Sequence, residues 1–183
     1  MGEDQSTGSK YLTVVRKRID QLKSQGEQAL NQLDDDEIHW TYNEESNSVS
    51  VIVKHLSGNM RSRWTDFLKT DGEKPDRNRD AEFEDSIASK AELLKVWEEG
   101  WVVFRETIYH LTETDLLKTV RIRGEKLGVI DAIERQLVHY SSHIGQILYV
   151  GKQIKGEKWQ TLSIPRGKSE EFLQSMKQKH EGK

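Results

Sequence analysis

Two histidines lie four residues apart in the stretch LVHYSSHIGQI (residues 137–147), at His139 and His143. If this stretch is helical, the spacing places both imidazoles on one face, one turn apart. Imidazole nitrogens are suitable ligands for Zn, Ni, Fe or Cu(II). A chain of this composition contains such a pair by chance in roughly one case in five, so a solvated polar helix face is an equal alternative.

A third histidine, His55, lies in IVKHLSGN (residues 52–59), within a separate helical pattern. Its neighbours on the helix face are mostly small, such as Gly58 and Ser62, and leave room beside the imidazole. Taken alone, His55 is best interpreted as a partly buried histidine with a satisfied hydrogen bond. Together with the pair, it could complete three imidazoles around one ion, with an open position that is typical of catalytic metal sites.

Four amphipathic patterns must position these side chains. They cover about residues 9–33, 47–69, 86–111 and 129–153, with Asn47 or Ser48 as the expected N-cap of the second. A long charged loop (70–85) joins the second pattern to the third, a small hairpin or extended turn around Gly124 precedes the fourth, and a short helix is expected from Ser169 onward. The chain is therefore predicted to be an all-α four-helix bundle. We expect a single domain over residues 1–183, with frayed tails at 1–8 and 179–183.

The last helical pattern separates its histidines from its main apolar stripe. At ~100° per residue, His139 and His143 lie about a third of a turn from that stripe, on the same side as Arg135 and Gln136. The stripe itself consists of Ile130, Ile133, Leu137, Tyr140, Ile144 and Leu148. This arrangement predicts that the histidines line the bundle interior or a cleft that opens from it, with a solvated stripe as the alternative.

The composition narrows the classes of function. The chain has no cysteine, which excludes disulfides, thiolate metal sites and a cysteine nucleophile. A net charge of −3 gives no electrostatic reason to expect binding to nucleic acid or to an anionic membrane. The polar N-terminus resembles no signal peptide and no apolar run approaches the ~20 residues of a membrane span. We therefore expect a cytoplasmic protein.

Three stretches carry a resemblance to a known family. They are NSVSVIVKHLSGNMRSRWTDFLKTDGEKPDRNRD, AIERQLVHYSSHIGQILYVGKQIKG and WQTLSIPRGKSEEF, of which VKHLSGN and HYSSHIGQI are the most specific. Over nearly its whole length the chain resembles a bacterial subfamily, of unknown function, of the DinB/YfiT-like superfamily of metal-dependent proteins. The resemblance implies a DinB-like four-helix bundle that tends to form homodimers. It also implies a divalent ion, Zn or Ni, held by His55, His139 and His143.

Some members of that superfamily are thiol S-transferases or isomerases that use a low-molecular-weight thiol such as bacillithiol or mycothiol. The resemblance therefore suggests a metal-dependent thiol S-transferase acting on a small molecule. A metal ion can hold an external thiol as its thiolate near neutral pH, so the missing cysteine is no obstacle. In this hypothesis Arg135 clamps a carboxylate of the thiol, and Asn59 and Gln136 contact the substrate. Structural roles for these polar residues, such as an ion pair or a helix-bridging hydrogen bond, are the alternative.

Two other functions are open at this stage. A metal-dependent hydrolase would need a general base, but no carboxylate is evident beside the three histidines, and Asp66 lies three turns from His55. A non-catalytic metal-binding bundle that binds a small molecule or a partner is the second alternative. The charged loop is expected to be solvated, with internal ion pairs, and a lid over the site is a less favoured interpretation. We assign no role to His110.

Overall fold

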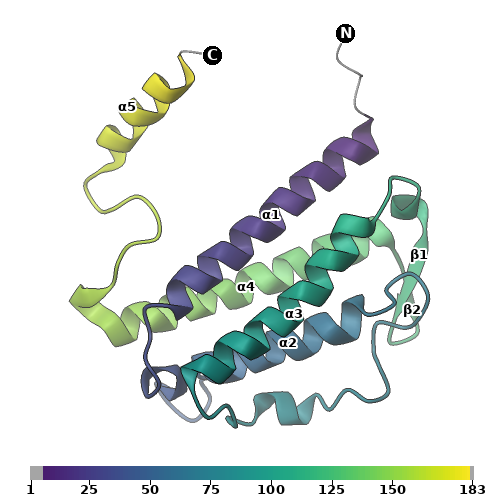
Figure 1. Ribbon diagram of the computed structural model, residues 1–183, viewed down its shortest axis with the longest axis horizontal. Helices are drawn as coiled ribbons and strands as arrows, with labels where there is room; N and C mark the ends of the chain where they lie inside the picture. The colour runs from purple at the N-terminus through teal and green to yellow at the C-terminus, as the bar shows by residue number, and fades with distance from the viewer. Residues whose placement is uncertain (1–5, 182–183) are drawn as a thin grey trace.

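The computed structural model describes residues 6–181, and four long helices form its body (Figure 1). They are α1 (Thr7–Leu30), α2 (Val49–Trp64), α3 (Lys90–His110) and α4 (Val129–Lys155). α1 packs mainly against α4, and α2 packs mainly against α3. α2 and α3 run in the same direction, so a long connection must return along the bundle between them. The predicted all-α bundle is confirmed, together with the small hairpin that precedes the last long helix.

Serine side chains define where three of the helices begin. Ser6, Ser48 and Ser89 each accept a hydrogen bond from the backbone N–H three residues further on. These bonds satisfy amide groups that have no partner inside the helix. α3 consequently begins at Lys90 rather than near residue 86. α2 ends at Trp64 rather than near residue 69, because the chain turns there and Asp66 adopts a positive φ of 49°.

The hairpin consists of β1 (Thr119–Ile122) and β2 (Glu125–Gly128), joined by Arg123 and Gly124. Both connecting residues have positive φ, 54° and 78°, which is the backbone of a tight two-residue turn. The carboxylate of Asp71, in the α2–α3 connection, accepts hydrogen bonds from the backbone N–H groups of Arg123 (2.8 Å) and Gly124 (2.7 Å). The connection and the hairpin are thereby fixed to each other.

Aromatic side chains from three helices meet in the core. Trp64 of α2, Phe104 of α3 and Tyr140 of α4 are fully buried, and Phe104 contacts the other two rings in tilted and edge-to-face arrangements, with ring centroids 4.6 and 5.1 Å apart. The Tyr140 hydroxyl accepts a hydrogen bond from Trp64 Nε1 and donates one to Asn59 Oδ1. This contact ties α4 to the face of α2 that also carries His55.

The buried face of α4 differs from the stripe expected from the sequence. Ile130 was placed in that stripe but is 42% exposed, whereas Ala132, Gln136 and Ile147 are buried. The buried face is therefore rotated toward the side of the helix that carries His139. This rotation brings the histidine side of α4 partly into the interior.

The last helix, α5 (Ser169–His180), stands away from the other four in Figure 1. It confirms the expected short helix from Ser169. α1 already begins at Thr7 and α5 continues to His180, so a helix extends into each of the two segments that were expected to fray. Residues 1–5 and 182–183 lie outside the described range.

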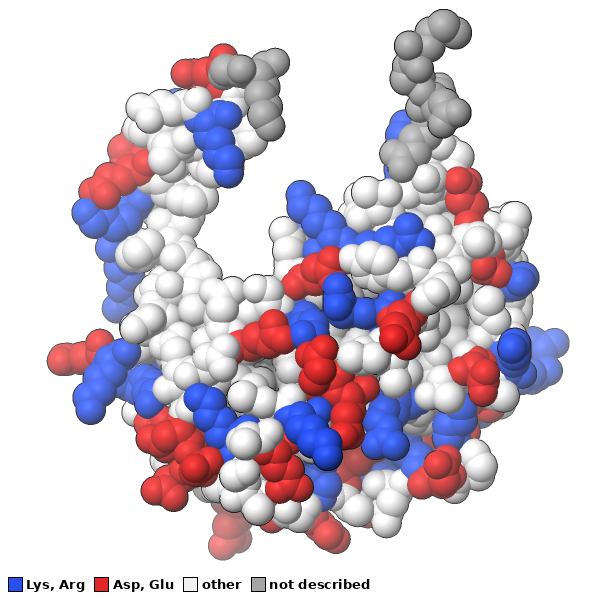
Figure 2. Space-filling model, viewed as in Figure 1, with Lys and Arg blue, Asp and Glu red and all other residues white. Residues whose placement is uncertain are grey.

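Acidic and basic side chains are interspersed over the face in Figure 2, without a large area of one sign. Among the helices of residues 6–181, none is long and apolar enough to cross a membrane.

Candidate metal centre

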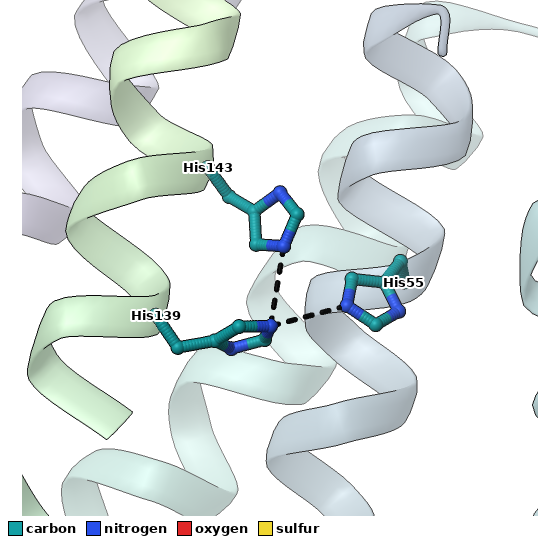
Figure 3. A group of neighbouring side chains, drawn as sticks. All are labelled: His55, His139 and His143. Atoms are coloured by element: carbon teal, nitrogen blue, oxygen red, sulfur yellow. Dashed lines mark hydrogen bonds between the residues drawn. The ribbon is translucent and has the colours of Figure 1, made fainter. Parts of the chain in front are cut away.

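The bundle brings the three histidines singled out in the sequence together (Figure 3). His55 projects from α2, and His139 and His143 project toward it from successive turns of α4. His139 Nε2 lies 3.3 Å from His55 Nε2 and 3.2 Å from His143 Nε2. One ring nitrogen from each residue falls within 4.8 Å of the others. Within residues 6–181 this cluster is the one group of at least three His, Asp or Glu side chains with ligand atoms that close.

The spacing of the nitrogens fits a tetrahedral ion. Zinc–nitrogen bonds of about 2.0–2.1 Å place two tetrahedral ligands about 3.3 Å apart. The two observed separations, 3.3 and 3.2 Å, agree with this value. His139 is therefore correctly spaced from both partners to share zinc or an ion of similar size with each, and His55 and His143 also lie with ligand atoms within 4.8 Å.

The three neighbouring Nε2 atoms cannot all be paired with one another by hydrogen bonds. His55 Nδ1 donates to the carboxylate of Glu82, and His143 Nδ1 donates to Gln146 Oε1; in the neutral form that a metal ligand requires, the Nε2 atom of each ring then carries a lone pair. His139 Nε2 can donate to only one of them. The other close contact then sets two lone pairs against each other. A cation among the three nitrogens would turn this repulsion into attraction.

The environment keeps two of the imidazoles neutral. Burial, together with the neighbouring His143 and His55, lowers the pKa of His139 to about 4. Burial also lowers the pKa of His143, although its hydrogen bond with Gln146 opposes the change. These side chains present lone pairs rather than protons at neutral pH, as metal ligands must.

Glu82 holds His55 in place from behind. It lies in a short 3-10 turn, η2 (Asp80–Phe83), of the α2–α3 connection and is 6% exposed. Its Oε2 contacts His55 Nδ1 at 3.0 Å, and Arg77 donates to its two oxygens at 2.7 and 2.8 Å. Burial raises the pKa of Glu82, but the bonds from Arg77 and His55 outweigh burial and the pKa is lowered. A carboxylate in this position fixes the tautomer and orientation of a ligating histidine.

The sequence analysis missed Glu82, and its conclusion that no carboxylate lies beside the histidines was wrong. The charged loop was expected to be solvated, yet Arg77 and Glu82 form a buried ion pair against α2. Gly58 of α2 leaves the space that Glu82 fills. The small residues beside His55 were the available signal, because they indicated that another group packs there.

The residues proposed for substrate contact share a pocket of about 190 Å³ beside His55 and His139. Asn59 and Gln136 are buried in its wall, and Arg135 is half-exposed at its edge, 3.6 Å from Glu125. Gln136 Oε1 has no hydrogen-bond partner within the described chain. The structure therefore places all three of these residues next to the cluster, where they could contact a bound molecule.

The remaining histidines and Asp66 lie elsewhere. His39 pairs with Asp85 outside the cluster, and exposed His110 contacts a carbonyl of its own helix. His180 is in α5, away from the bundle. Asp66 lies in the turn that follows α2 and is not among the residues that line the pocket at the histidines. The chemistry of the site therefore depends on His55, His139, His143 and the groups that surround them.

Comparison with known proteins gives a family but no activity. Neither a search of curated proteins nor a search of solved structures found a match to the chain. A family described as "Protein of unknown function (DUF1572)" matches residues 6–168, which include the whole histidine cluster and end just before α5. The chain therefore belongs to the DUF1572 family of proteins of unknown function.

Proposed function

We propose that this protein is a metal-dependent enzyme of the DinB/YfiT-like type that transfers an external low-molecular-weight thiol to a small molecule. The observation that carries the proposal is the convergence of three imidazole Nε2 atoms from two helices, with His139 Nε2 3.3 Å from that of His55 and 3.2 Å from that of His143. His55, His139 and His143 would hold one divalent ion, Zn or Ni. The resemblance to the DinB/YfiT-like superfamily supports both the ligand set and the type of reaction.

Three protein ligands favour a catalytic site over a structural one, because structural zinc sites are closed by four. Glu82 is the nearest carboxylate, but its oxygens already bind His55 and Arg77. The pocket at His55 and His139 gives an external molecule access to the cluster. A bound ion would lower the pKa of a thiol in this position, so that the thiolate nucleophile forms near neutral pH.

The chain's own residues would bind and orient the reactants. Glu82 holds His55 in the tautomer that presents Nε2. Asn59, Gln136 and Arg135 line the pocket and can hydrogen-bond to a polar substrate. The pocket lining contains no carboxylate that could act as a general base on water. This favours thiol transfer over hydrolysis.

The first experiment is metal analysis of the untagged protein after incubation with Zn or Ni, beside His55→Ala and His139→Ala. His110→Ala is the matched control, since His110 is exposed and lies outside the cluster. We expect about one ion per chain in the wild type and the control, and a large loss in both cluster variants. Equal metal content in all four proteins, or none in the wild type, would refute the proposed site.

The second experiment tests the reaction. The metal-loaded protein is mixed with bacillithiol and a small electrophile, and formation of the thioether is followed by mass spectrometry. We expect turnover that disappears in His139→Ala and after removal of the metal. A metal-loaded protein that forms no conjugate with any thiol tested would leave the alternative, a non-catalytic metal-binding bundle.

A further inference from the structure

Arginines surround the pocket beside the histidine cluster. The nine residues that line it include Arg63, Arg77, Arg79, Arg123 and Arg135. Five of these nine side chains are guanidinium groups that are charged at all physiological pH values, and none is a carboxylate. They come from α2, the α2–α3 connection, the hairpin and α4, so four separate segments contribute to this concentration of positive charge.

Two of the arginines are buried without full hydrogen bonding. Arg63 and Arg77 have side chains only 5% and 4% exposed, yet Arg63 Nε and Arg77 Nη1 have no hydrogen-bond partner within the described residues. The nearest carboxylate oxygen to Arg77 Nη1 is Glu73 Oε1, 3.5 Å away. Buried donors are nearly always satisfied in folded proteins, and each one left unpaired destabilises the fold. Each of these two guanidinium groups therefore keeps part of its charge uncompensated beside the pocket.

The carboxylates near the pocket do not balance its arginines. Glu73 alone contacts three of them, at 3.0 Å from Arg63, 3.5 Å from Arg77 and 2.9 Å from Arg123. Arg77 also uses Glu82, and Arg135 lies near Glu125. Four of the five guanidinium groups therefore share three carboxylates as ion-pair partners, and Arg79 contacts none of the three. Asp71, which accepts the Arg123 N–H, is a fourth carboxylate nearby, so the arginines still outnumber the carboxylates.

The backbone of Arg123 is a further sign that its side chain is used. It occupies a turn position with φ of 54°, where Asn, Asp or Gly is strongly preferred. Asp71 stabilises this conformation by accepting the Arg123 and Gly124 N–H groups. Strained residues of this kind concentrate at ligand-binding sites.

We propose that this pocket binds an oxyanion, a carboxylate or phosphate group, on the substrate. Guanidinium groups bind such oxygens through charge-assisted, often bidentate hydrogen bonds. About 190 Å³ accommodates a compact group, and the rest of the molecule would extend toward His139. The inference deepens the proposed function by naming the class of substrate. It rests on that function only where the bound molecule is taken to react, and not for the binding of the anion itself.

The test uses calorimetric titration of the metal-free protein with inorganic phosphate, malonate and the neutral analogue malonamide, at constant ionic strength. We expect saturable binding of one anion per chain and no binding of malonamide. The relative affinities for phosphate and malonate identify which oxyanion the pocket prefers. Binding of malonamide as tight as that of malonate would overturn the proposal.

Variants test whether the arginines of the pocket are responsible. Arg123→Asn keeps a residue that tolerates positive φ, and Arg135→Gln changes a half-exposed side chain, so neither threatens the fold. Each should weaken anion binding by about fivefold or more. Arg121→Gln is the matched control, because it removes the same charge from the same hairpin but does not line the pocket. An equal loss in the control, or no loss in either pocket variant, would overturn the proposal.

A separate variant distinguishes this inference from the proposed metal function. His143 belongs to the histidine cluster but does not line the pocket. His143→Ala should therefore impair metal binding and leave anion binding within twofold of wild type. In the wild-type protein, anion binding without metal binding would refute the metal function alone, whereas metal binding without anion binding would refute this inference alone.

Discussion

Gly58 sets the position of Glu82, and replacing it with alanine tests how the site is supported. A Cβ atom at this position would lie 2.7 Å from Glu82 Cδ and closer still to Oε1. Carbon atoms do not approach this closely, so the carboxylate would have to move. Because Glu82 Oε2 is bonded to His55 Nδ1, the movement would release His55 from its orientation.

The magnitude follows from two opposing effects. Alanine is favoured over glycine in a helix interior by about 1 kcal/mol. Loss of one buried hydrogen bond to a charged group costs about 1.5–3 kcal/mol. We therefore expect Gly58→Ala to lower the free energy of unfolding by about 1 kcal/mol, which for a chain of this size lowers Tm by about 2–4 °C. Affinity for zinc should fall about tenfold to hundredfold, as it does when the partner of a ligating histidine is lost.

Urea unfolding of the metal-free protein and zinc competition with a chromophoric chelator measure the two effects. Gly145→Ala is the matched control, since this glycine of α4 is exposed and a Cβ there would meet nothing within 4 Å. The control should be stabilised by up to about 1 kcal/mol and bind zinc normally. If Gly58→Ala is stabilised as much as the control and binds zinc equally well, the assigned role of Glu82 is wrong.

Three further predictions concern the same region. Glu82→Gln should weaken zinc binding about tenfold to hundredfold while the fold survives, as measured by chelator competition and circular dichroism. The pKa of His139 is about 4 in the folded protein and ordinarily 6.5, so the unfolded chain binds this proton at a higher pH than the folded chain does. The unfolding free energy of the metal-free protein should therefore fall as the pH drops from 6.5 to 4. It should fall less in His139→Asn, as urea titrations across that pH range would measure. Tyr140→Phe leaves the buried Trp64 N–H without its acceptor and Asn59 Oδ1 without its donor, and should lower the unfolding free energy by about 1–3 kcal/mol; a change below 0.5 kcal/mol would count against this network.

Helical periodicity located the histidine cluster because its members lie on regular helices. The spacing of four residues from His139 to His143 fixes their relative placement on α4, whatever the rest of the chain does. The rotation of α4 was less predictable. Ile130 and Ile147 are both isoleucine, yet one is exposed and the other buried, because packing against neighbouring helices decides which edge of an apolar stripe faces inward.

Loop residues are positioned by contacts that no local period describes. Arg77 and Glu82 lie five residues apart in a segment crowded with charges of both signs, and nothing in the segment distinguishes them from Asp76 or Glu84. Their burial depends on the path of the connection over α2. For the same reason Arg77, Arg79 and Arg123 were not grouped in advance with Arg135, which lies on a helix near His139. Arg63 also lies on a helix, but its place in the last turn of α2 suggested only the usual basic residue at a helix C-terminus.

The contact between Asp71 and the hairpin turn has a consequence for how this family can change. One carboxylate accepts two backbone N–H groups of the turn, and Gly72 N donates to the Arg121 carbonyl beside it. An inserted or deleted residue in either segment would shift these groups out of register. The two segments can therefore tolerate length changes only as a pair, and transfer of the pocket to another helical scaffold would require both to be grafted together.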